Sequence, residues 1–366
     1  FFIILSLLVL VHELGHFGVA KYFGIRVDEF GLGFPPKVKK LFEWKGTTFT
    51  LNALPFGGFV KIYGESPDDS DLKNSSDIPS GHGQSFINQN RLVQAAVLVA
   101  GVVGNFLFAW LLFSIGFMSG IAAPAGLDLP LTNPETVITS VLTESPAEKA
   151  GLKTGDSVVK VERGEASLFQ PLTPETVSEF ITNSFGPVNV TVERGDETLI
   201  KTITPLSGVW TETPAIGVAM EVVGTVKLPF LQSITQGFVT TKDLTVATAK
   251  GLVLFLSQAV TGRADFSTVA GPIGLVGMVG EANDLGFGYL LTFTALISIN
   301  LAVLNLLPIP ALDGGRLLFV GVEAISRRRI PSKFFNLVNT AGFFALVLLM
   351  IVISVNDVQN IVQKIF

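Results

Sequence analysis

The chain has 366 residues, of which 48% are hydrophobic and only 15% are charged. Soluble globular proteins usually carry about 25% charged residues, so this composition indicates a membrane protein with some soluble mass attached. The net charge of −5 leaves no basic footprint, which argues against nucleic acid as a partner. Cysteine is absent, which excludes disulfides and thiolate metal sites.

Four apolar segments are long enough to cross a bilayer, which takes about 20 residues. They cover residues 1–22, 93–121, 289–309 and 334–355. The first segment contains two histidines and a glutamate, which are out of place in the apolar region of a signal peptide, so we expect a membrane helix. The third ends in NLLPIPALDGGR, whose prolines and glycines break the helix. Irregular backbone is tolerated at membrane depth where it is buried in protein or lines a wet cavity.

Basic residues set the expected orientation in the plasma (inner) membrane. The connection between the third and fourth segments contains Arg316, Lys333 and the run RRR at 327–329, against one acid, Glu323. The positive-inside rule therefore places this connection in the cytoplasm. The connection between the first two segments is also rich in Lys and Arg and is expected on the same side. Both termini and the long segment between the second and third spans are then expected outside the cytoplasm.

That long segment divides into two parts. Residues 130–225 predict a soluble α/β module, because strand-like runs such as DSVVKVER and VNVTVERG accompany a helix-like run that begins at Thr173. Residues 226–288 are less polar and repeat apolar residues at helical spacing. They predict either an amphipathic helix on the membrane surface or a helix packed on the soluble module. Earlier in the chain, residues 65–85 predict a flexible cytoplasmic loop, in which His82 is expected to be solvated.

The first apolar segment contains HELGH, a His-Glu-x-x-His motif formed by His12, Glu13 and His16. Positions i and i+4 share one face of a helix, so the two imidazoles can bind one zinc ion at about 2.0–2.1 Å. Glu13 can then act as a general base toward a metal-bound water. The alternative is that all three are satisfied polar groups in a helix bundle. Ionisable residues inside a membrane span are costly, which favours the functional interpretation.

A catalytic zinc usually has three protein ligands and one open position. The chain has no cysteine and only one other histidine, His82, so the third ligand is expected to be a carboxylate or an amide. Asp313, in the broken end of the third span, is the leading candidate because nearby basic residues place it on the membrane side where His16 lies. The alternative is that Asp313 and its following glycine only form a turn.

These motifs resemble those of the site-2 proteases, a family of intramembrane zinc metalloproteases, and more closely its bacterial regulator-of-sigma-E protease branch. HELGH at 12–16 and NLLPIPALDGG at 305–315 resemble the two metal-site motifs of the family. LPFGGFVKIYGE at 54–65 resembles the re-entrant β-hairpin region of the branch, and GPIG at 271–274 resembles a short motif before its third membrane helix. The motifs occur in the right order along nearly the whole chain.

The resemblance implies a polytopic α-helical membrane protein with four transmembrane helices, an inserted α/β PDZ-like domain and a membrane-associated β-hairpin. Its expected parts are a first membrane core, an extracytoplasmic PDZ domain, an amphipathic or interfacial region and a second membrane core, at residues 1–121, 130–225, 226–288 and 289–366. SPAEKAGLKTGDSVVKV, at 145–161, is the recognisable core of the PDZ-like module. Several members of the branch carry two such modules, and this chain has room for one.

The resemblance also implies roles for individual residues. His12, His16 and Asp313 would hold Zn²⁺, and Glu13 would be the catalytic acid and base. Substrate-binding roles are expected for a further set: Asn300, Asn305, Phe56, Gly57, Gly58 and Phe59. The alternative for the two asparagines is hydrogen bonding between helices. Such a helix contact is also the preferred interpretation for Asn105 in the second span.

The expected reaction is hydrolysis of a peptide bond in or near the transmembrane segment of a protein substrate, within membrane lipid. A substrate helix must unwind first, and a hairpin at roughly 47–63 offers an edge that can hold the unwound segment by β-addition. The alternative is a hairpin that only shields the site. Membrane-bound anti-sigma factors and leftover signal peptides are the expected kinds of substrate.

Two roles are open for the PDZ-like module. It can bind a peptide between the strand at 136–141 and the helix at 174–182, with residues 215–220 as a further strand in permuted order. It can also act as a size filter against bulky ectodomains, which we favour. The competing hypothesis for the whole chain is a non-proteolytic membrane metal transporter or PDZ scaffold, although a transporter would need more intramembrane acids and histidines.

Overall fold

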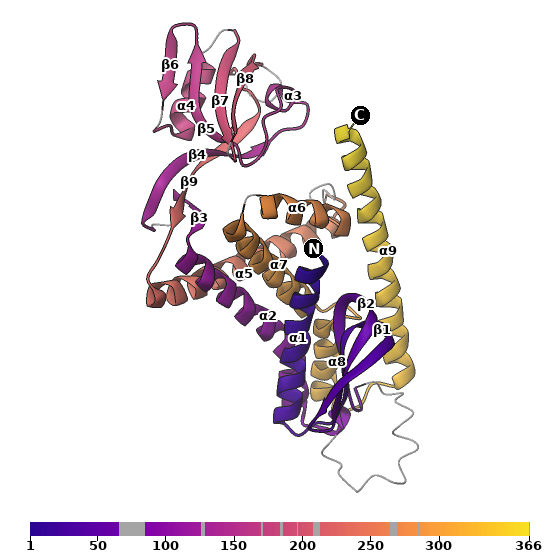
Figure 1. Ribbon diagram of the computed structural model, residues 1–366. Helices are drawn as coiled ribbons and strands as arrows, with labels where there is room; N and C mark the ends of the chain where they lie inside the picture. The colour runs from indigo at the N-terminus through magenta and orange to yellow at the C-terminus, as the bar shows by residue number, and fades with distance from the viewer. Residues whose placement is uncertain are drawn as a thin grey trace. The chain divides into compact units, whose positions relative to one another are not determined.

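The computed structural model describes residues 1–65, 85–125, 129–169, 171–183, 186–195, 197–207, 213–263, 269–284 and 286–365. The predicted loop at 65–85, with His82, lies outside the described residues except at its two ends. The chain forms two compact units (Figure 1). A helical unit comprises residues 1–114, 234–282 and 291–366, and a β-rich unit comprises residues 115–233 and 283–290.

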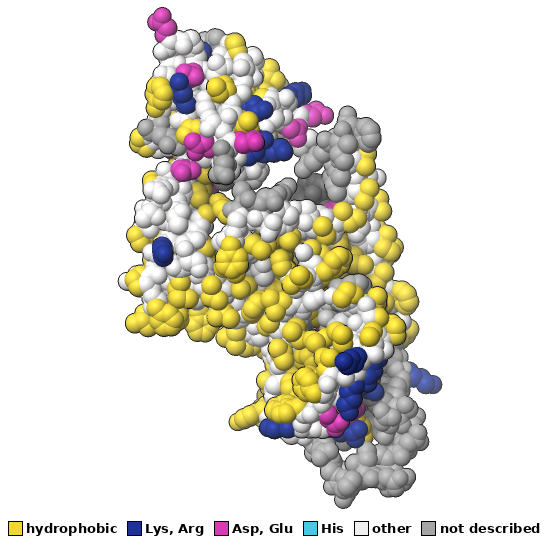
Figure 2. Space-filling model, in the orientation of Figure 1, with side chains coloured by type: hydrophobic (Ala, Val, Ile, Leu, Met, Phe, Trp, Pro, Cys, Tyr) yellow, Lys and Arg dark blue, Asp and Glu magenta, His cyan; other side chains and the backbone are white. Residues whose placement is uncertain are grey.

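Among the described residues, four helices are long and apolar enough to cross a membrane. They are α1 (Phe2–Tyr22), α2 (Arg91–Ser119), α7 (Phe287–Leu306) and α9 (Ser332–Ile365). The helices match the four predicted spans to within a few residues at most ends. Hydrophobic side chains cover much of the visible surface of the helical unit, and Lys and Arg side chains gather at the end that carries its small sheet (Figure 2).

Helix α1 ends where its sequence reaches a glycine. Gly24 has a φ of +70°, a left-handed conformation that favours glycine. Its N–H donates to the carbonyl of Lys21 at 3.1 Å, and the N–H of Ile25 donates to the carbonyl of Ala20 at 2.9 Å. This pair of bonds is a Schellman motif, which satisfies the last carbonyls of the helix and turns the chain into the following strand.

The helical unit also contains α5 (Phe230–Val260), α6 (Pro272–Asp284), α8 (Asp313–Ser326) and the short 3-10 helix η2 (Phe86–Asn88). Over its part in this unit, α5 packs on α2: the Trp110 indole donates to the carbonyl of Ile234 at 2.8 Å, and its ring meets that of Phe238. One prediction for residues 226–288 is a helix packed on the soluble module, whereas these contacts of α5 are with the apolar helix α2. At the start of α6, the backbone N–H groups of Gly271 and Gly274 donate to the buried Asp357 carboxylate of α9.

The link between α7 and α8 reverses the chain within a few residues. Pro308 and Pro310 stop α7, because proline lacks the N–H that a helix interior needs. Gly314 and Gly315 then start α8 in contact with the link itself. A Cβ at Gly314 would lie 2.1 Å from the carbonyl oxygen of Leu307, and one at Gly315 would lie 2.2 Å from that of Ile309. Only glycine allows this close return.

Strands β1 (Val27–Trp44) and β2 (Thr47–Ile62) form an antiparallel sheet on α1 (Figure 1). The expected hairpin within 47–63 is wrong in its pairing. Residues 48–51 and 58–61 both pair with residues 29–32 of β1, and residues 47–52 also pair with residues 37–44. The tight turn is instead at Lys45 and Gly46, which both have positive φ values, as a two-residue hairpin turn of this kind requires.

The β-rich unit is a seven-stranded sheet with two short helices. Its elements are β3 (Ile121–Pro124), β4 (Leu131–Val141), α3 (Pro146–Lys149), β5 (Ser157–Arg163), β6 (Ala166–Phe169), α4 (Pro174–Thr182), β7 (Val188–Arg194), β8 (Glu197–Ile203) and β9 (Val218–Val226). The strand order is β3-β9-β4-β5-β7-β8, with β6 beside β5. Thr173 caps α4 through a capping box, as the sequence predicts.

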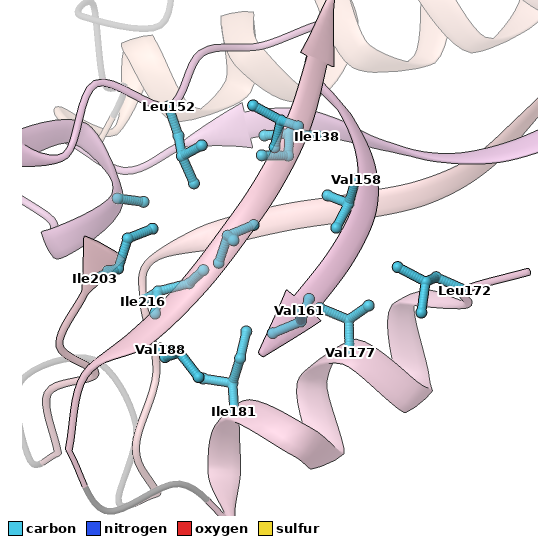
Figure 3. Packing of buried hydrophobic residues seen from close by; sticks show 13 residues of the cluster. Ile138, Leu152, Val158, Val161, Leu172, Val177, Ile181, Val188, Ile203 and Ile216 are labelled. Carbon is cyan, nitrogen blue, oxygen red and sulfur yellow. The ribbon is translucent and has the colours of Figure 1, made fainter. Parts of the chain in front are cut away.

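One hydrophobic core holds this unit together. Val158 and Val161 of β5 face Val177 and Ile181 on the inner side of α4 (Figure 3). Beside the core, the fully buried Asp156 carboxylate accepts from the Arg194 guanidinium at 2.6 and 2.8 Å. The hydrogen bonds that Arg194 donates to Asp156 raise the pKa of Arg194 above its usual value. This pair ties the loop before β5 to the end of β7.

The sheet order corrects one expectation for the peptide groove. The strand at 136–141 lies within β4, which is paired with β5 on one side and with β9 on the other. It therefore has no free edge at 136–137 for an added peptide. Strand β9 pairs with β3 only over residues 223–226. No described strand pairs with the outer edge of β9 over residues 218–222.

Candidate metal centre

Three potential metal ligands converge in the helical unit: His12, His16 and Asp313. Nε2 of His12 lies 2.9 Å from Oδ2 of Asp313, and Nε2 of His16 lies 3.2 Å from the same oxygen. The two Nε2 atoms are 3.1 Å apart. Both histidines are buried, and Asp313 is partly buried. The three donor atoms thus form a small triangle beneath the protein surface.

This triangle fits a zinc ion. Tetrahedral zinc with bonds of about 2.0–2.1 Å places its ligand atoms about 3.3 Å apart, close to the three distances here. The donor set of two imidazole nitrogens and one carboxylate oxygen also belongs to known catalytic zinc sites, which leave a fourth position open. The side chains of His12, His16 and Asp313 therefore have both the spacing and the chemistry to hold zinc.

The local folding explains how residues 301 positions apart come together. His12 and His16 are one helical turn apart on the buried face of α1. Asp313 is the first residue of α8, directly after the broken link that follows α7. A carboxylate at this position is also favoured by the positive end of the helix dipole. The proline and glycine residues of the link therefore aim Asp313 at the histidines of α1.

Helix α2 supports the histidines with three residues spaced four apart, Val97, Gly101 and Asn105, which lie on one face. Nδ1 of His16 lies 2.7 Å from the carbonyl oxygen of Val97 and donates to it, which leaves Nε2 free as a ligand. A Cβ at Gly101 would lie 2.5 Å from Nε2 of His16 and 2.7 Å from Nε2 of His12, so glycine makes room for both rings. The Asn105 amide reaches His12.

A cavity of about 420 Å³ opens beside the three ligands. It is bordered by Glu13 of α1, which follows His12 in the sequence. A carboxylate therefore lines the same cavity as the three donor atoms without being one of them. Gly58 and Phe59 of β2 form another wall. A further boundary is the ion pair between Arg316 and Glu65. The cavity is thus lined by polar groups inside a helical unit with an apolar surface.

Only some of the predicted substrate-binding residues line the cavity. Asn305, Gly58 and Phe59 line the cavity. Asn300 is exposed on α7 and is not among the lining residues. Gly57 lies under the Phe34 ring, because a Cβ there would come within 2.5 Å of it. The side chain of Phe56 lies outside the described residues.

Three features near the ligands were not predicted as parts of the site. They are Gly101, the ion pair between Arg316 and Glu65, and the side chain of Asn105. The backbone carbonyl of Asn105 does accept from Ser298 of α7 at 2.8 Å, as a helix contact requires. Its amide faces the metal centre instead. A signal was present in the four-residue spacing of GVVGN, which puts Gly101 and Asn105 on one helix face.

Comparison with known proteins identifies the family. Residues 1–349 match the model of Peptidase family M50. The chain belongs to this family. It is 34% identical to the Clostridium perfringens protein "Putative zinc metalloprotease CPE1693" over 359 residues, which cover 96% of each chain. It is 29% identical to "Zinc metalloprotease RasP" of Geobacillus kaustophilus, with 98% of this chain and 97% of that protein covered.

These matches confirm the predicted membership of the site-2 proteases, because family M50 is that family. The members use zinc, and the chain is a zinc metalloprotease of a membrane-bound family. Its four apolar helices agree with that assignment. The family match spans both units of the fold, so the sheet at residues 121–226 is an insertion in a membrane metalloprotease.

Proposed function

We propose that this chain is an intramembrane endopeptidase that binds one zinc ion through His12, His16 and Asp313 and cleaves transmembrane protein substrates. The observation that carries the proposal is that His12 and His16, halfway along the apolar helix α1, converge with Asp313 of α8 beside a cavity bordered by a carboxylate. A purely structural polar cluster would not need the additional Glu13 at the cavity wall. Asp313 bridges the two histidines, as a third ligand would.

In this mechanism a bound zinc would polarise the scissile carbonyl and lower the pKa of a water molecule at the open position. Glu13 is proposed as the general base: its carboxylate would accept a proton from the attacking water and later give it to the leaving amine. Its position next to His12 on α1 keeps its carboxylate at the cavity without using it as a ligand. Asn305 lines the same cavity and is suited to hold the substrate backbone by hydrogen bonds.

The substrate segment is proposed to lie as an extended strand along residues 54–62 of β2. This part of β2 is at the edge of its sheet, and no described strand pairs with its outer side. Gly58 and Phe59 bring that edge to the cavity wall. Their packing depends on Gly31 in β1, because a Cβ at Gly31 would lie 2.3 Å from the Phe59 ring. β-Addition here would keep an unwound substrate segment beside the metal centre.

The small sheet is also proposed to lie against the membrane. Large apolar side chains in the second half of β1 are exposed in the structure: Val38, Leu41, Phe42 and Trp44. An exposed apolar patch of this kind favours contact with lipid. Lys37, Lys39 and Lys40 lie among them. This mixture suits the cytoplasmic interface of the plasma membrane. It supports the proposal that the cleavage site faces the cytoplasm, and the connection that contains the β-rich unit is proposed to be extracytoplasmic.

The β-rich unit is proposed to be a PDZ-like domain of permuted strand order that filters substrates by size. Its candidate peptide edge is β9 over residues 218–222, close to α4, which replaces the edge expected at 136–141. Anti-sigma factors and leftover signal peptides, after removal of their bulky ectodomains, are the proposed substrates. A terminal peptide bound along β9 is the alternative role for this edge.

The test is cleavage of a single-span model substrate in detergent by zinc-loaded protein and by the variant Glu13→Gln. We expect cleavage within the apolar segment of the substrate, a rate lower by about 10²–10⁴-fold in the variant, and equal zinc content. Cleavage at the same rate by the variant would refute the general-base assignment. Two zinc-loaded proteins that both fail to cleave would favour the metal transporter or scaffold.

A further inference from the structure

The two histidines of the metal centre differ in the group that contacts their Nδ1 atom, the ring nitrogen that faces away from the other ligands. Nδ1 of His16 donates to the backbone carbonyl of Val97, a pure acceptor. Nδ1 of His12 lies 3.4 Å from Nδ2 of Asn105, at the position four residues after Gly101 on α2. Nε2 of His12 points the other way, 2.9 Å from the Asp313 carboxylate. A neutral imidazole that ligates a metal through Nε2 carries its proton on Nδ1.

The Asn105 amide is therefore turned the wrong way for this task. An N–H on His12 Nδ1 would face the NH₂ group of Asn105, and two donors cannot bond to each other. At the same time Oδ1 of Asn105 is buried and has no hydrogen-bond partner among the described residues, while Asn105 as a whole is 0% exposed. A half-turn of the amide exchanges oxygen and nitrogen, which are nearly equal in size. The turn would give Oδ1 the missing donor.

We propose that Asn105 is a positioning residue for the metal centre, whose Oδ1 accepts the Nδ1–H of His12 and thereby fixes the tautomer and the ring orientation that present Nε2 to zinc. The inference rests on the proposed role of His12 as a ligand. Val97 and Asn105 then perform the same task for the two histidines, one with a backbone carbonyl and one with a side-chain amide. Gly101, between them on α2, leaves the room in which both rings stand.

A helix contact alone does not account for the Asn105 side chain. The hydrogen bond that joins α2 to α7 here runs from Ser298 Oγ to the backbone carbonyl of Asn105 at 2.8 Å, so it does not use the amide. Any residue at position 105 would supply that carbonyl. The contact between helices and the contact with His12 can therefore be removed separately, by Ser298→Ala and by Asn105→Leu.

The experiment measures zinc affinity of the full chain in detergent, by competition with a chelator of known affinity, together with the visible spectrum of the Co²⁺-loaded protein. Groups that hydrogen-bond to the second ring nitrogen of a metal-binding histidine typically contribute 10–100-fold to metal affinity. We expect Asn105→Leu to weaken zinc binding by about that factor and to change the Co²⁺ spectrum. Asn105→Asp keeps an oxygen acceptor and is expected to bind zinc at least as tightly as the wild type. Ser298→Ala is the matched control and is expected to leave zinc affinity unchanged.

Unchanged zinc affinity in Asn105→Leu, or weaker binding in Asn105→Asp, would overturn the inference. If Asn105→Leu does not fold, the comparison of Asn105→Asp with the wild type decides alone, because a donor role and an acceptor role predict opposite results. His12→Ala separates this inference from the proposed function. Loss of zinc in His12→Ala without any change in Asn105→Leu refutes only the positioning role, whereas unchanged zinc affinity in His12→Ala refutes the ligand assignment itself.

Discussion

Gly101 is the position where the smallest possible change should disturb the metal centre most. A Cβ added there would lie 2.5 Å from Nε2 of His16, 2.6 Å from Cε1 of His12 and 2.7 Å from Nε2 of His12. Ordinary van der Waals contact begins at 3.4 Å, so the rings or α2 must retreat by about 0.7–0.9 Å. A retreat of the His16 ring would also stretch its hydrogen bond to the carbonyl of Val97 on α2.

The variant Gly101→Ala should therefore separate the ligands from one another. A misplacement of about 1 Å can cost about 10²-fold in catalysis, and we expect at least that loss in the rate of substrate cleavage. Zinc affinity should fall as well. Folding should be retained, because alanine is the most favourable residue in a helix. The assays are cleavage of a single-span substrate, chelator competition for zinc, and the melting temperature of the zinc-free protein.

The matched control is Gly18→Ala in α1, where the added Cβ would have no described atom within 4 Å beyond its chain neighbours and the nearby backbone of its own helix. This variant should keep wild-type cleavage and zinc affinity. If Gly101→Ala also keeps both, the two imidazoles do not stand where the structure places them, and the reasoning about the α2 face is refuted. A fall in melting temperature without any loss of zinc would likewise contradict it.

Other changes test separate parts of the molecule. Asp313→Asn should weaken zinc binding, measured by chelator competition, by more than the 10–100-fold typical of groups that only hydrogen-bond to a ligand. Wild-type zinc affinity in this variant would show that Asp313 is not a ligand. Gly315→Ala should abolish zinc binding and cleavage, because its Cβ would lie 2.2 Å from the Ile309 carbonyl oxygen, and a fully active variant would contradict the described link. Arg194→Met should destabilise the β-rich unit by about 3 kcal/mol, because it leaves the buried Asp156 carboxylate unpaired. Faster hydrogen exchange in β5 and β7 of the whole 366-residue chain would show this, and unchanged exchange would argue against it.

The metal centre was the most predictable part of the chain, for a physical reason. Its two histidines are related by helical periodicity, which a sequence shows directly, and the apolar surroundings make polar residues conspicuous. The scarcity of His and the absence of Cys leave a carboxylate or an amide as the third ligand, and Asp313 is the leading candidate. The helices were predictable for the same reason, since long apolar runs have few other structural solutions in a membrane.

The sheet pairings were less predictable. The edge expected at 136–141 lies inside the sheet, and the expected hairpin within 47–63 instead pairs with β1. Strand pairing depends on tertiary contacts between distant residues, and the turn at Lys45 and Gly46 lacks the Asn-Gly pair that usually marks such a hairpin. The role of Asn105 was hidden as well, because an amide in an apolar helix looks the same in sequence whether it contacts a helix or a metal ligand.

X-ray absorption at the zinc edge tests the central claim most directly, since it counts the ligands of the metal in the purified protein. We predict two imidazole nitrogens and oxygen ligands at about 2.0–2.1 Å in the wild type, and one imidazole in His16→Asn. An unchanged imidazole signal in that variant would contradict the account, because the zinc would then be bound somewhere other than between His12, His16 and Asp313.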